Sequence, residues 1–559
     1  PKGSIQYTIW VEKCEGDWQE SLLTVFQKRK LYDVSNFSDT LYKRKDLQWM
    51  QHAYTMHLMM SWDKYFYDRK THQYKIDDFI KRGNQLYGGD DIVAIWPTWP
   101  TLGLDQRNQF DLFNDLPGGL PAIKNISNRL SKQNKHLFIS YNPWDRDTRF
   151  SNHLNGLSWL INQTNADGVV LDTQGNSSDS LQKAADSVRK GVIMYSEGMA
   201  VPKDMQGIIS GRVHNALYYP PILNLNKFIE PKFSIFRVAE LYKEPIAREF
   251  YLSLFNGYGT EINIMSPGEP EWVTSQYAIL KKTSSILRNF SSYFHSDSVK
   301  MLIPTLDVSI WVNQWNAHNR SVYTIYSEHS EGFNSLLFGA DTNNEYHYID
   351  VYHHKEIVPE INMDHWILKE VFENRDTIHK FIRVQLDPFD GKYRRTNNAG
   401  NVSCIFKTIR MIDVRQKNNY IEMKLLNQQN ENNLELVISR TDPVLDTSPI
   451  VLPAKNQNID IYKNFGSFEG KLVFQLFQNI EGESRKELID ETVLELPSGE
   501  ARLIPYQTKY SFKKKPTIHS INVDRKMVTV PKGMFTFNRT HGDNFISYPK
   551  IYDSSVLIN

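Results

Sequence analysis

Short apolar strands alternate with amphipathic helical segments from about residue 46 to residue 294. Several strand candidates are continuous apolar runs, such as residues 169–171 and 192–194, which is typical of strands covered on both faces. The helical faces between them repeat at i, i+3, i+4 and i+7, as at Leu181, Ala184, Ala185 and Val188. Eight such units in roughly 250 residues predict an α/β fold, a closed (β/α)₈ or TIM barrel. The eight strand candidates are residues 57–66, 91–97, 136–142, 167–172, 191–197, 211–215, 233–239 and 260–265.

An open, doubly wound parallel sheet is the main alternative for a chain of alternating strands and helices. That fold usually carries a glycine-rich phosphate-binding loop after its first strand. No such loop follows residues 57–66. The closed barrel is therefore the better interpretation.

The hydrophobic periodicity of the sequence changes after a helix that we expect over residues 269–294. From residue 300 onward, short strand runs separated by turns replace the helical periodicity, which is typical of all-β sandwich domains. At the other end, residues 5–11 look strand-like and residues 17–29 helical. The predicted organisation is an N-terminal lead-in (1–45), a catalytic barrel (46–295), a β-sandwich domain (296–390), a second β domain (391–525) and the start of a truncated C-terminal domain (526–559).

The charges of the chain are balanced, with 65 basic and 64 acidic residues and a net charge of +1. Because they are interspersed, without the one-sided basic stripe of a nucleic-acid-binding protein, we expect no nucleic-acid partner. No apolar run reaches the length of a membrane span, and the first residues do not resemble a signal peptide. The two cysteines, Cys14 and Cys404, lack metal-ligand spacing and are expected to be free buried thiols.

Aromatic residues make up 13% of the chain, and several of its 12 tryptophans stand beside proline, aspartate or asparagine rather than inside apolar runs. Flat rings next to polar groups suit the faces of sugars, which present C–H patches ringed by hydroxyls. The alternative is that these rings pack large hydrophobic cores. The aromatic content is compatible with carbohydrate binding without requiring it.

The catalytic groups of such a barrel come from the carboxyl ends of its strands. Asp172 follows the apolar run 169–171 and precedes a turn that contains Gly175, and Glu197 closes the next strand before Gly198, which we expect to let the chain turn sharply. Two carboxyl groups on neighbouring strands would face one pocket, as glycoside cleavage requires. The alternatives are a turn or helix-capping role for Asp172 and a structural ion pair with an arginine for Glu197.

Other polar and aromatic residues near the strand ends are candidates for substrate binding. Aspartates and tyrosine could bind sugar hydroxyls, tryptophans could stack on a ring, and the basic residues could orient a carboxylate. Arg237 could equally form an ion pair with Glu240. The candidates are Trp62, Asp63, Trp96, Trp99, Asp105, Tyr141, Asp145, Arg212, His214, Arg237 and Glu240.

Three histidines, His347, His353 and His354, lie close together in the β region. They lack a further ligand at metal spacing, so a solvated loop is the better interpretation. No metal or other cofactor is expected, because two carboxyl groups and a water molecule suffice to cleave a glycoside.

Three segments of the sequence resemble the α-galactosidase-like barrels: residues 110–120 (FDLFNDLPGGL), 135–143 (KHLFISYNP) and 166–172 (ADGVVLD). In those barrels the aspartate that ends the fourth strand is the nucleophile, which the resemblance places at Asp172. In the related endo-α-N-acetylgalactosaminidases the acid/base is a glutamate ending the fifth strand, which corresponds to Glu197. The α-galactosidases proper use an aspartate on strand six, where this chain has none. Residues 526–537 resemble the opening of a formylglycine-generating-enzyme-like domain.

The resemblance implies a retaining glycoside hydrolase that acts on an α-linked hexose of the galactose or N-acetylgalactosamine type in an oligosaccharide or glycan. We expect Asp172 to stay ionised, with its pKa held down by nearby arginine or amide groups, and Glu197 to be protonated. Such an enzyme would be secreted or periplasmic. The alternative is a catalytically silent glycan-binding barrel that serves as a targeting module for a C-terminal domain.

Overall fold

The structure is a computed structural model of the whole chain. It describes all residues except 1–2, 10, 12, 14–15, 29–37, 62, 98–106, 144, 146–151, 199, 201–203, 214–224, 242–243, 264–269, 342, 344, 362–379, 392–396, 427–432, 467, 498–532, 541–550 and 559.

Eight parallel strands close into a barrel in the order β1-β10-β9-β8-β7-β6-β5-β4. Each of the eight predicted strands is present, and the predicted barrel is confirmed. The strands are β1 (Thr55–Met60), β4 (Ile92–Trp96), β5 (His136–Tyr141), β6 (Gly168–Leu171), β7 (Ile193–Ser196), β8 (Ser210–Val213), β9 (Ser234–Glu240) and β10 (Gly259–Asn263).

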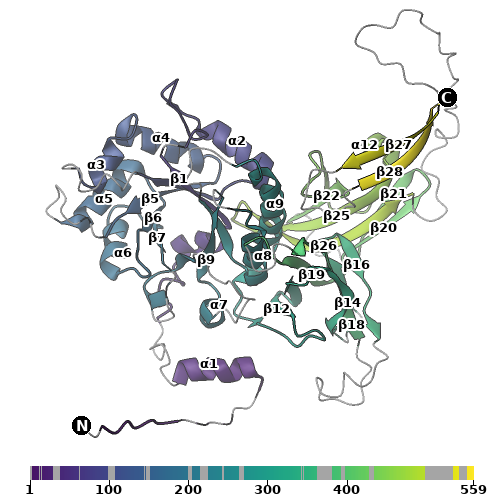
Figure 1. The fold of residues 1–559 in the computed structure, drawn as a ribbon, viewed down its shortest axis with the longest axis horizontal. Helices are drawn as coiled ribbons and strands as arrows, with labels where there is room; N and C mark the ends of the chain where they lie inside the picture. The colour runs from purple at the N-terminus through teal and green to yellow at the C-terminus, as the bar shows by residue number, and fades with distance from the viewer. Residues whose placement is uncertain are drawn as a thin grey trace, which may run out of the picture.

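Helices surround this barrel on its outer side (Figure 1). Most present an apolar face to the strands and begin at a polar cap, such as Ser178, whose side chain accepts a hydrogen bond from the backbone of Leu181. The helices are α2 (Ile76–Tyr87), α3 (Gln109–Asn114), α4 (Gly119–Ser131), α5 (His153–Thr164), α6 (Asp179–Asp186), α7 (Leu225–Ile229), α8 (Ala247–Asn256), α9 (Val273–Asn289) and α10 (Ser291–Phe294); a small hairpin, β2 (Tyr67–Asp68) and β3 (Gln73–Tyr74), precedes α2.

Aromatic rings fill the barrel interior. Tyr195 on β7 contacts Phe138 on β5 and Phe236 on β9, with ring centroids 6.3 and 5.8 Å apart. Because these strands are not neighbours in the sheet, the contacts cross the interior and identify all three side chains as inward-facing. Gly168 and Gly259 make room for the rings, since a Cβ atom at either position would overlap Phe138 or Phe236.

The N-terminal lead-in is only partly structured as expected. Helix α1 (Trp18–Lys28) lies beside α7, and Gln19 donates a hydrogen bond of 2.9 Å to the carbonyl of Met301. A 3₁₀ helix, η2 (Lys45–His52), leads into β1. The strand-like run at residues 5–11 forms no strand at its described positions, and its apolar side chains are at least 78% exposed, because no sheet edge accepts it.

The first β domain consists of a six-stranded sheet, in the order β11-β12-β13-β19-β15-β16, and a three-stranded sheet, β14-β18-β17. Strand β19 lies at the centre of the larger sheet, so this sheet extends past the expected boundary at residue 390. The strands are β11 (Val299–Lys300), β12 (Ile310–Ala317), β13 (Arg320–Ser327), β14 (Phe333–Gly339), β15 (Tyr346–Asp350), β16 (Lys355–Ile357), β17 (Glu360–Ile361), β18 (Lys380–Leu386) and β19 (Asn401–Ile409).

The second β domain packs the sheet β20-β21-β24 against the sheet β23-β22-β25-β26 around its own apolar core. Its elements are β20 (Ile412–Lys417), β21 (Tyr420–Leu425), β22 (Leu434–Arg440), β23 (Ile450–Pro453), β24 (Gln457–Asp460), α12 (Ile461–Phe465), β25 (Gly470–Asn479) and β26 (Lys486–Leu496). Beyond it, β27 (Gly533–Thr540) and β28 (Ile551–Ile558) form an antiparallel pair. This pair does not test the resemblance of residues 526–537 to a formylglycine-generating enzyme.

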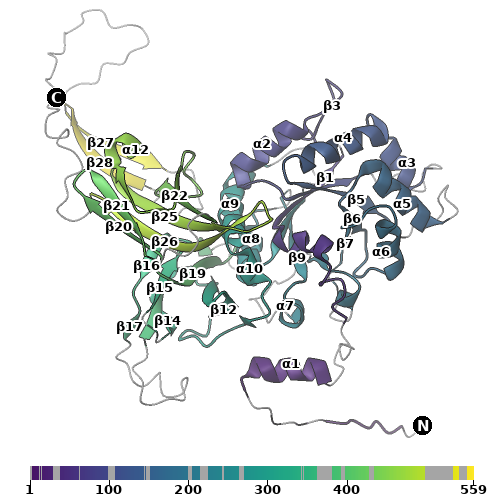
Figure 2. The ribbon, with the colours of Figure 1, turned by 180° about the vertical axis from the view of Figure 1, so that it is seen from behind.

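Helices α8 and α9 lie between the barrel and the β domains (Figures 1 and 2). One hydrophobic core runs through this junction and includes Phe255 of α8, Trp315 of β12, Phe406 of β19 and Leu488 of β26. The barrel and both β domains are therefore packed together rather than joined only by chain. Among the helices of the described residues, none combines the length and hydropathy that a membrane crossing requires.

We predict that Gly168→Ala lowers the free energy of unfolding by about 1–3 kcal/mol, because the added methyl group overpacks the barrel against Phe138. Gly207→Ala is the control. A Cβ at Gly207 meets nothing closer than 3.7 Å, so that variant should stay within about 0.5 kcal/mol of the parent. Urea denaturation measures both, and equal stabilities would contradict this account of the barrel interior.

Candidate active site

Asp172 and Glu197 lie side by side at the carboxyl end of the barrel, where the sequence places them. Leu171 pairs with Ser196 in the ladder between β6 and β7, and the two acids are the next residues on each strand. The amide of Asp172 donates to the carbonyl of Tyr141 (2.9 Å), and the amide of Glu197 donates to that of Leu171 (3.1 Å). Each acid lies two residues beyond an inward-facing position, so both side chains face the barrel mouth.

The two carboxyl groups lie close enough that a side-chain hydrogen bond to Glu197 is among the causes that raise the pKa of Asp172. Glu197 also accepts hydrogen bonds from the guanidinium of Arg212 and from the backbone N–H of Thr173. Asp172 is 6% exposed as a residue, and the side chain of Glu197 is 20% exposed. Glu197 is therefore the more accessible of the two acids.

The pKa of Asp172 differs from the sequence-based expectation. Burial, the hydrogen bond to Glu197 and the negative charge of Glu197 raise this pKa from its ordinary value of 3.8 to about 8, against the opposing charge of Arg212. The expectation that basic groups hold the pKa of Asp172 down is wrong for the unliganded site, because the guanidinium contacts Glu197 and not Asp172. Since the two groups interact strongly, the raised pKa belongs to the pair rather than to Asp172 alone.

The turns after β6 and β7 bring the backbone N–H of Thr173 against the carboxyl group of Glu197. Thr173 has a φ of 55°, a conformation that a β-branched residue rarely adopts, and its N–H points at the Glu197 carboxylate. The chain bends at Glu197 and Gly198, as expected, without a left-handed conformation at Gly198. Its role is close approach, since a Cβ at Gly198 would lie 3.2 Å from the Cα of Gly175.

A buried network of ion pairs lies in the barrel interior next to Asp172 and Glu197. Arg212 on β8, 2% exposed, donates to the Glu261 carboxylate (2.5 Å) as well as to Glu197. Glu261 on β10 is fully buried and also accepts from the hydroxyl of Tyr195 (2.7 Å). Arg212 therefore acts on the pair through Glu197, and sequence reasoning missed Glu261. The signal was an acid in the middle of a predicted barrel strand, since a charge in a barrel interior requires a partner.

Two of the predicted substrate-binding residues face away from the barrel mouth. Arg237 on β9 forms a buried ion pair with Glu249 of α8, and not with Glu240. The hydroxyl of Tyr141 on β5 is hydrogen-bonded to His153 at the start of α5. Both predictions are corrected for the same reason, because successive residues of a strand point to opposite faces and these two point to the helices.

Other strand-end residues share the inward orientation of the pair. Trp96 and Glu240 end β4 and β9, two residues beyond inward-facing positions, and Glu240 pairs with Asn263 in the ladder. Asn263 is 6% exposed, and its side-chain oxygen has no hydrogen-bond partner. A buried acceptor of this kind at the barrel mouth is suited to a ligand hydroxyl. Sequence reasoning missed Asn263, because the eighth strand had been expected to run on to residue 265.

The remaining candidates divide into two groups. Asp63 lies in the loop after β1 and accepts from the amide of Tyr65 (2.7 Å), and Asp145 accepts from the amide of Gln109 at the start of α3 (2.6 Å). These contacts shape loops at the mouth. Four candidates lie outside the described residues: Trp62, Trp99, Asp105 and His214.

The three histidines of the β region do not form a solvated loop, and that expectation is wrong. His347 is 8% exposed and His354 5% exposed; they bind the carboxylates of Asp490 and Glu491 at 2.8 and 2.9 Å. His353 is hydrogen-bonded to Asp350 (2.7 Å). The acids of β26 lie more than a hundred residues away in sequence, so the pairing could not be read from local spacing. Among the described residues, no three of His, Cys, Asp and Glu are grouped so that they could hold a metal ion. Cys404 is buried and free.

No family model and no curated protein matches the sequence. Among solved structures, the chain is similar to an α-amylase from Geobacillus thermoleovorans complexed with acarbose (11% identity, TM-score 0.42, 64% of this chain and 98% of that chain). It is also similar to a putative α-galactosidase from Bacteroides fragilis (11% identity, TM-score 0.41, 64% and 80%) and a γ-CGTase from alkalophilic Bacillus clarkii (9% identity, TM-score 0.37, 83% and 84%). The barrel fold itself rests on the strand pairing described above.

We predict that Arg212→Met lowers the free energy of unfolding by about 3–5 kcal/mol, because it leaves the buried Glu261 carboxylate without its cation. The double variant Arg212→Met, Glu261→Gln should be more stable than the single variant, since the buried charge is then absent. Chemical denaturation of the three proteins provides the measurement. A single variant as stable as the parent would show that the network does not hold the barrel interior.

A second prediction concerns the pH dependence of stability. Because the pKa of Asp172 is about 8 in the folded chain and 3.8 ordinarily, the folded state binds this proton more tightly than the unfolded state. This contribution to stability is complete below about pH 4 and is lost as the pH rises towards 8. Asp172→Asn removes the titrating group, so its advantage over the parent should grow across that window. Denaturation curves at several pH values test it, and a constant difference would contradict the raised pKa.

Proposed function

We propose that this chain is a retaining glycoside hydrolase that cleaves an α-linked hexose through Asp172 and Glu197. One observation carries the proposal. Two carboxyl groups lie next to each other at the mouth of a (β/α)₈ barrel, and the pKa of one of them, Asp172, is raised to about 8 by burial and by Glu197. Glycoside cleavage needs one carboxylic acid and one carboxylate in the same pocket, and the raised pKa of Asp172 supports such a division.

The catalytic roles of Asp172 and Glu197 depend on which of the two holds the proton when a substrate binds. In the unliganded site the pKa of Asp172 is raised, and Arg212 and the backbone N–H of Thr173 donate hydrogen bonds to the carboxyl group of Glu197. The resemblance to α-galactosidase-like barrels assigns the nucleophile to Asp172 and the acid/base to Glu197. This assignment requires Glu197 to hold the proton as the glycosidic oxygen approaches it.

The spacing of the pair supports a retaining mechanism. Retaining enzymes hold their carboxyl groups roughly 5–5.5 Å apart, and inverting enzymes about 6.5–9.5 Å apart, to admit a water molecule. Carboxyl groups in hydrogen-bond contact need only a small separation to reach the shorter spacing.

The identity of the sugar rests on the sequence resemblance, which favours galactose or N-acetylgalactosamine in an oligosaccharide or glycan. Neither a metal nor another cofactor enters the proposed reaction, because the pair and a water molecule complete it. We place the enzyme outside the cell or in the periplasm, where such glycans are encountered.

A catalytically silent glycan-binding barrel is the second candidate. The contacts of Glu197 with Arg212 and Thr173 favour it, because they stabilise the carboxylate form of the residue that must act as the acid. Binding of an α-galactoside without any turnover would support this candidate.

Two variants test the roles with aryl α-galactosides and α-N-acetylgalactosaminides. Asp172→Asn should abolish turnover of every substrate, because no glycosyl-enzyme can form. Glu197→Gln should keep the first step for a nitrophenol leaving group, which needs no proton, and lose more than about 10² of the rate with a poor leaving group. Added azide should then restore turnover of Glu197→Gln and give a product of retained configuration, which NMR identifies.

Asp115→Asn is the control, because Asp115 is a surface carboxylate at the end of α3 and should leave the rate unchanged. If Asp172→Asn is the variant that azide rescues, the two roles are exchanged. If the parent chain binds these glycosides and cleaves none of them, the silent barrel replaces the proposal.

A further inference from the structure

A second cavity lies away from the carboxylate pair, where helix α9, the first β domain and the second β domain meet. Its volume is about 690 Å³, within the range of pockets that enclose small ligands, and junctions between domains are common places for such pockets. Its walls come from α8 and α9, from the turn between β15 and β16, from β18 and from the loop after β22. Neither Asp172 nor Glu197 lines it, so any function there is separate from the barrel site.

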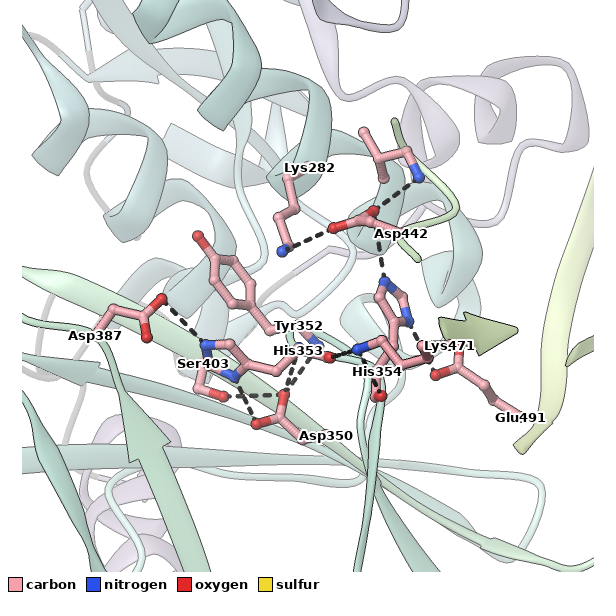
Figure 3. A network of polar contacts seen from close by, with 11 residues as sticks. Lys282, Asp350, Tyr352, His353, His354, Asp387, Ser403, Asp442, Lys471 and Glu491 are labelled. Atoms are coloured by element: carbon pink, nitrogen blue, oxygen red, sulfur yellow. Dashed lines mark hydrogen bonds and ion pairs between the residues drawn. The ribbon is translucent and has the colours of Figure 1, made fainter. Parts of the chain in front are cut away.

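The floor of the cavity is fixed by a carboxylate–histidine chain (Figure 3). Asp350 accepts from the backbone amides of Tyr352 and His353, at 3.0 Å each, and from the imidazole of His353 at 2.7 Å. On its other side His353 is paired with Asp387 at 3.3 Å. Burial lowers the pKa of His353, but the charge of Asp350 and its hydrogen bonds raise it to about 9. The imidazolium is thus held between two acids.

A second chain fixes the opposite wall. Lys282 of α9 is paired with Asp442 at 3.2 Å, and its ammonium group lies 4.4 Å from the centre of the Tyr352 ring. Asp442 also lies 3.7 Å from His354, whose other ring nitrogen is hydrogen-bonded to Glu491 at 2.9 Å. The backbone of His354 has a φ of 53°, a strained conformation that these contacts hold in place. Figure 3 shows the two chains side by side, joined through the neighbouring residues His353 and His354.

Basic and acidic side chains are interspersed around the cavity, which bears on the ligand. Lys282 is paired with Asp442, and His353 with Asp387. The same walls also carry His354, Lys355, Lys471, Glu356 and Glu495. An ionic ligand would bring a charge that meets wall side chains of both signs. A purely apolar ligand would bury the polar groups of the walls without giving them hydrogen bonds.

Mixed donors and acceptors beside apolar surface suit a polyhydroxyl compound. Ammonium groups at Lys282 and Lys471 donate, and Gln385 and Asp387 accept, so both halves of a hydroxyl group can be satisfied. Apolar wall surface comes from Ile279, Val444 and Leu445 and can cover the C–H face of a sugar ring.

We propose that this interdomain cavity is a second carbohydrate site that binds a short neutral oligosaccharide. The site needs no catalytic group, and it holds a glycan to the β domains independently of what the barrel does. The proposal therefore stands or falls separately from glycoside cleavage at Asp172 and Glu197.

The test uses the full chain with Asp172→Asn, so that no probe is consumed, and raffinose and maltotriose as neutral probes. Crystals soaked in each probe should show a sugar against Asp387 and Gln385. Isothermal titration should give binding that Ala278→Trp abolishes, because Ala278 is an exposed residue of α9 on the cavity wall and the indole fills the space. Gln385→Ala should weaken binding about tenfold, as expected for the loss of a ligand hydrogen bond.

Thr274→Trp is the matched control, since Thr274 is exposed on the same helix and does not line the cavity. This variant should bind the probes like the parent. A sugar found only at the barrel mouth, binding unchanged in Ala278→Trp, or no binding of either neutral probe would overturn the proposal. Tighter binding of the anionic trisaccharide 3′-sialyllactose would overturn the assignment to a neutral ligand. If the parent chain cleaves no aryl glycoside but raffinose binds in the cavity, the proposed hydrolase activity is wrong and the proposed second site stands.

Discussion

The guanidinium of Arg212 holds together the carboxyl groups at the centre of the barrel. It bridges Glu197 at the mouth and Glu261 in the interior, and no water can reach Glu261 in its place because that side chain is fully buried. A buried ion pair contributes little net stability, but either partner alone is strongly unfavourable. Strands β7, β8 and β10 are therefore tied to one geometry, and the position of the Glu197 carboxylate follows from it.

The sequence predicted the fold well where the signal is local. Strands buried on both faces read as continuous apolar runs, and their number and spacing predicted the closed barrel. Two features needed long-range information. Strand β19 completes a sheet whose other strands lie before the expected domain boundary, and residues 5–11 have the composition of a strand but no partner edge. Strand pairing is a property of the folded chain and not of the segment.

The candidate site was predicted in part, and the errors have one geometric origin. Asp172 and Glu197 could be placed together because they end neighbouring strands. Tyr141 and Arg237 occupy similar positions in the sequence, but a shift of one residue along a strand turns a side chain from the barrel mouth to the helices. The raised pKa of Asp172 could not be predicted from the sequence either, because its causes are burial and the closeness of Glu197, which only the fold creates.

The interdomain network and the barrel network differ in how many cations accompany their carboxyl groups. In the interdomain network, Asp350, Asp387, Asp442 and Glu491 each contact a lysine or a histidine, and the imidazoles stay charged because their pKa values lie near 9. Three cations, Lys282, His353 and His354, contact these four acids. In the barrel network of the described residues, one guanidinium is paired with Glu197 and Glu261, and Asp172 lies beside them without a cation of its own. Because a buried carboxylate without a cation is unfavourable, this larger deficit of positive charge favours a proton on Asp172, which is the direction in which its pKa is shifted.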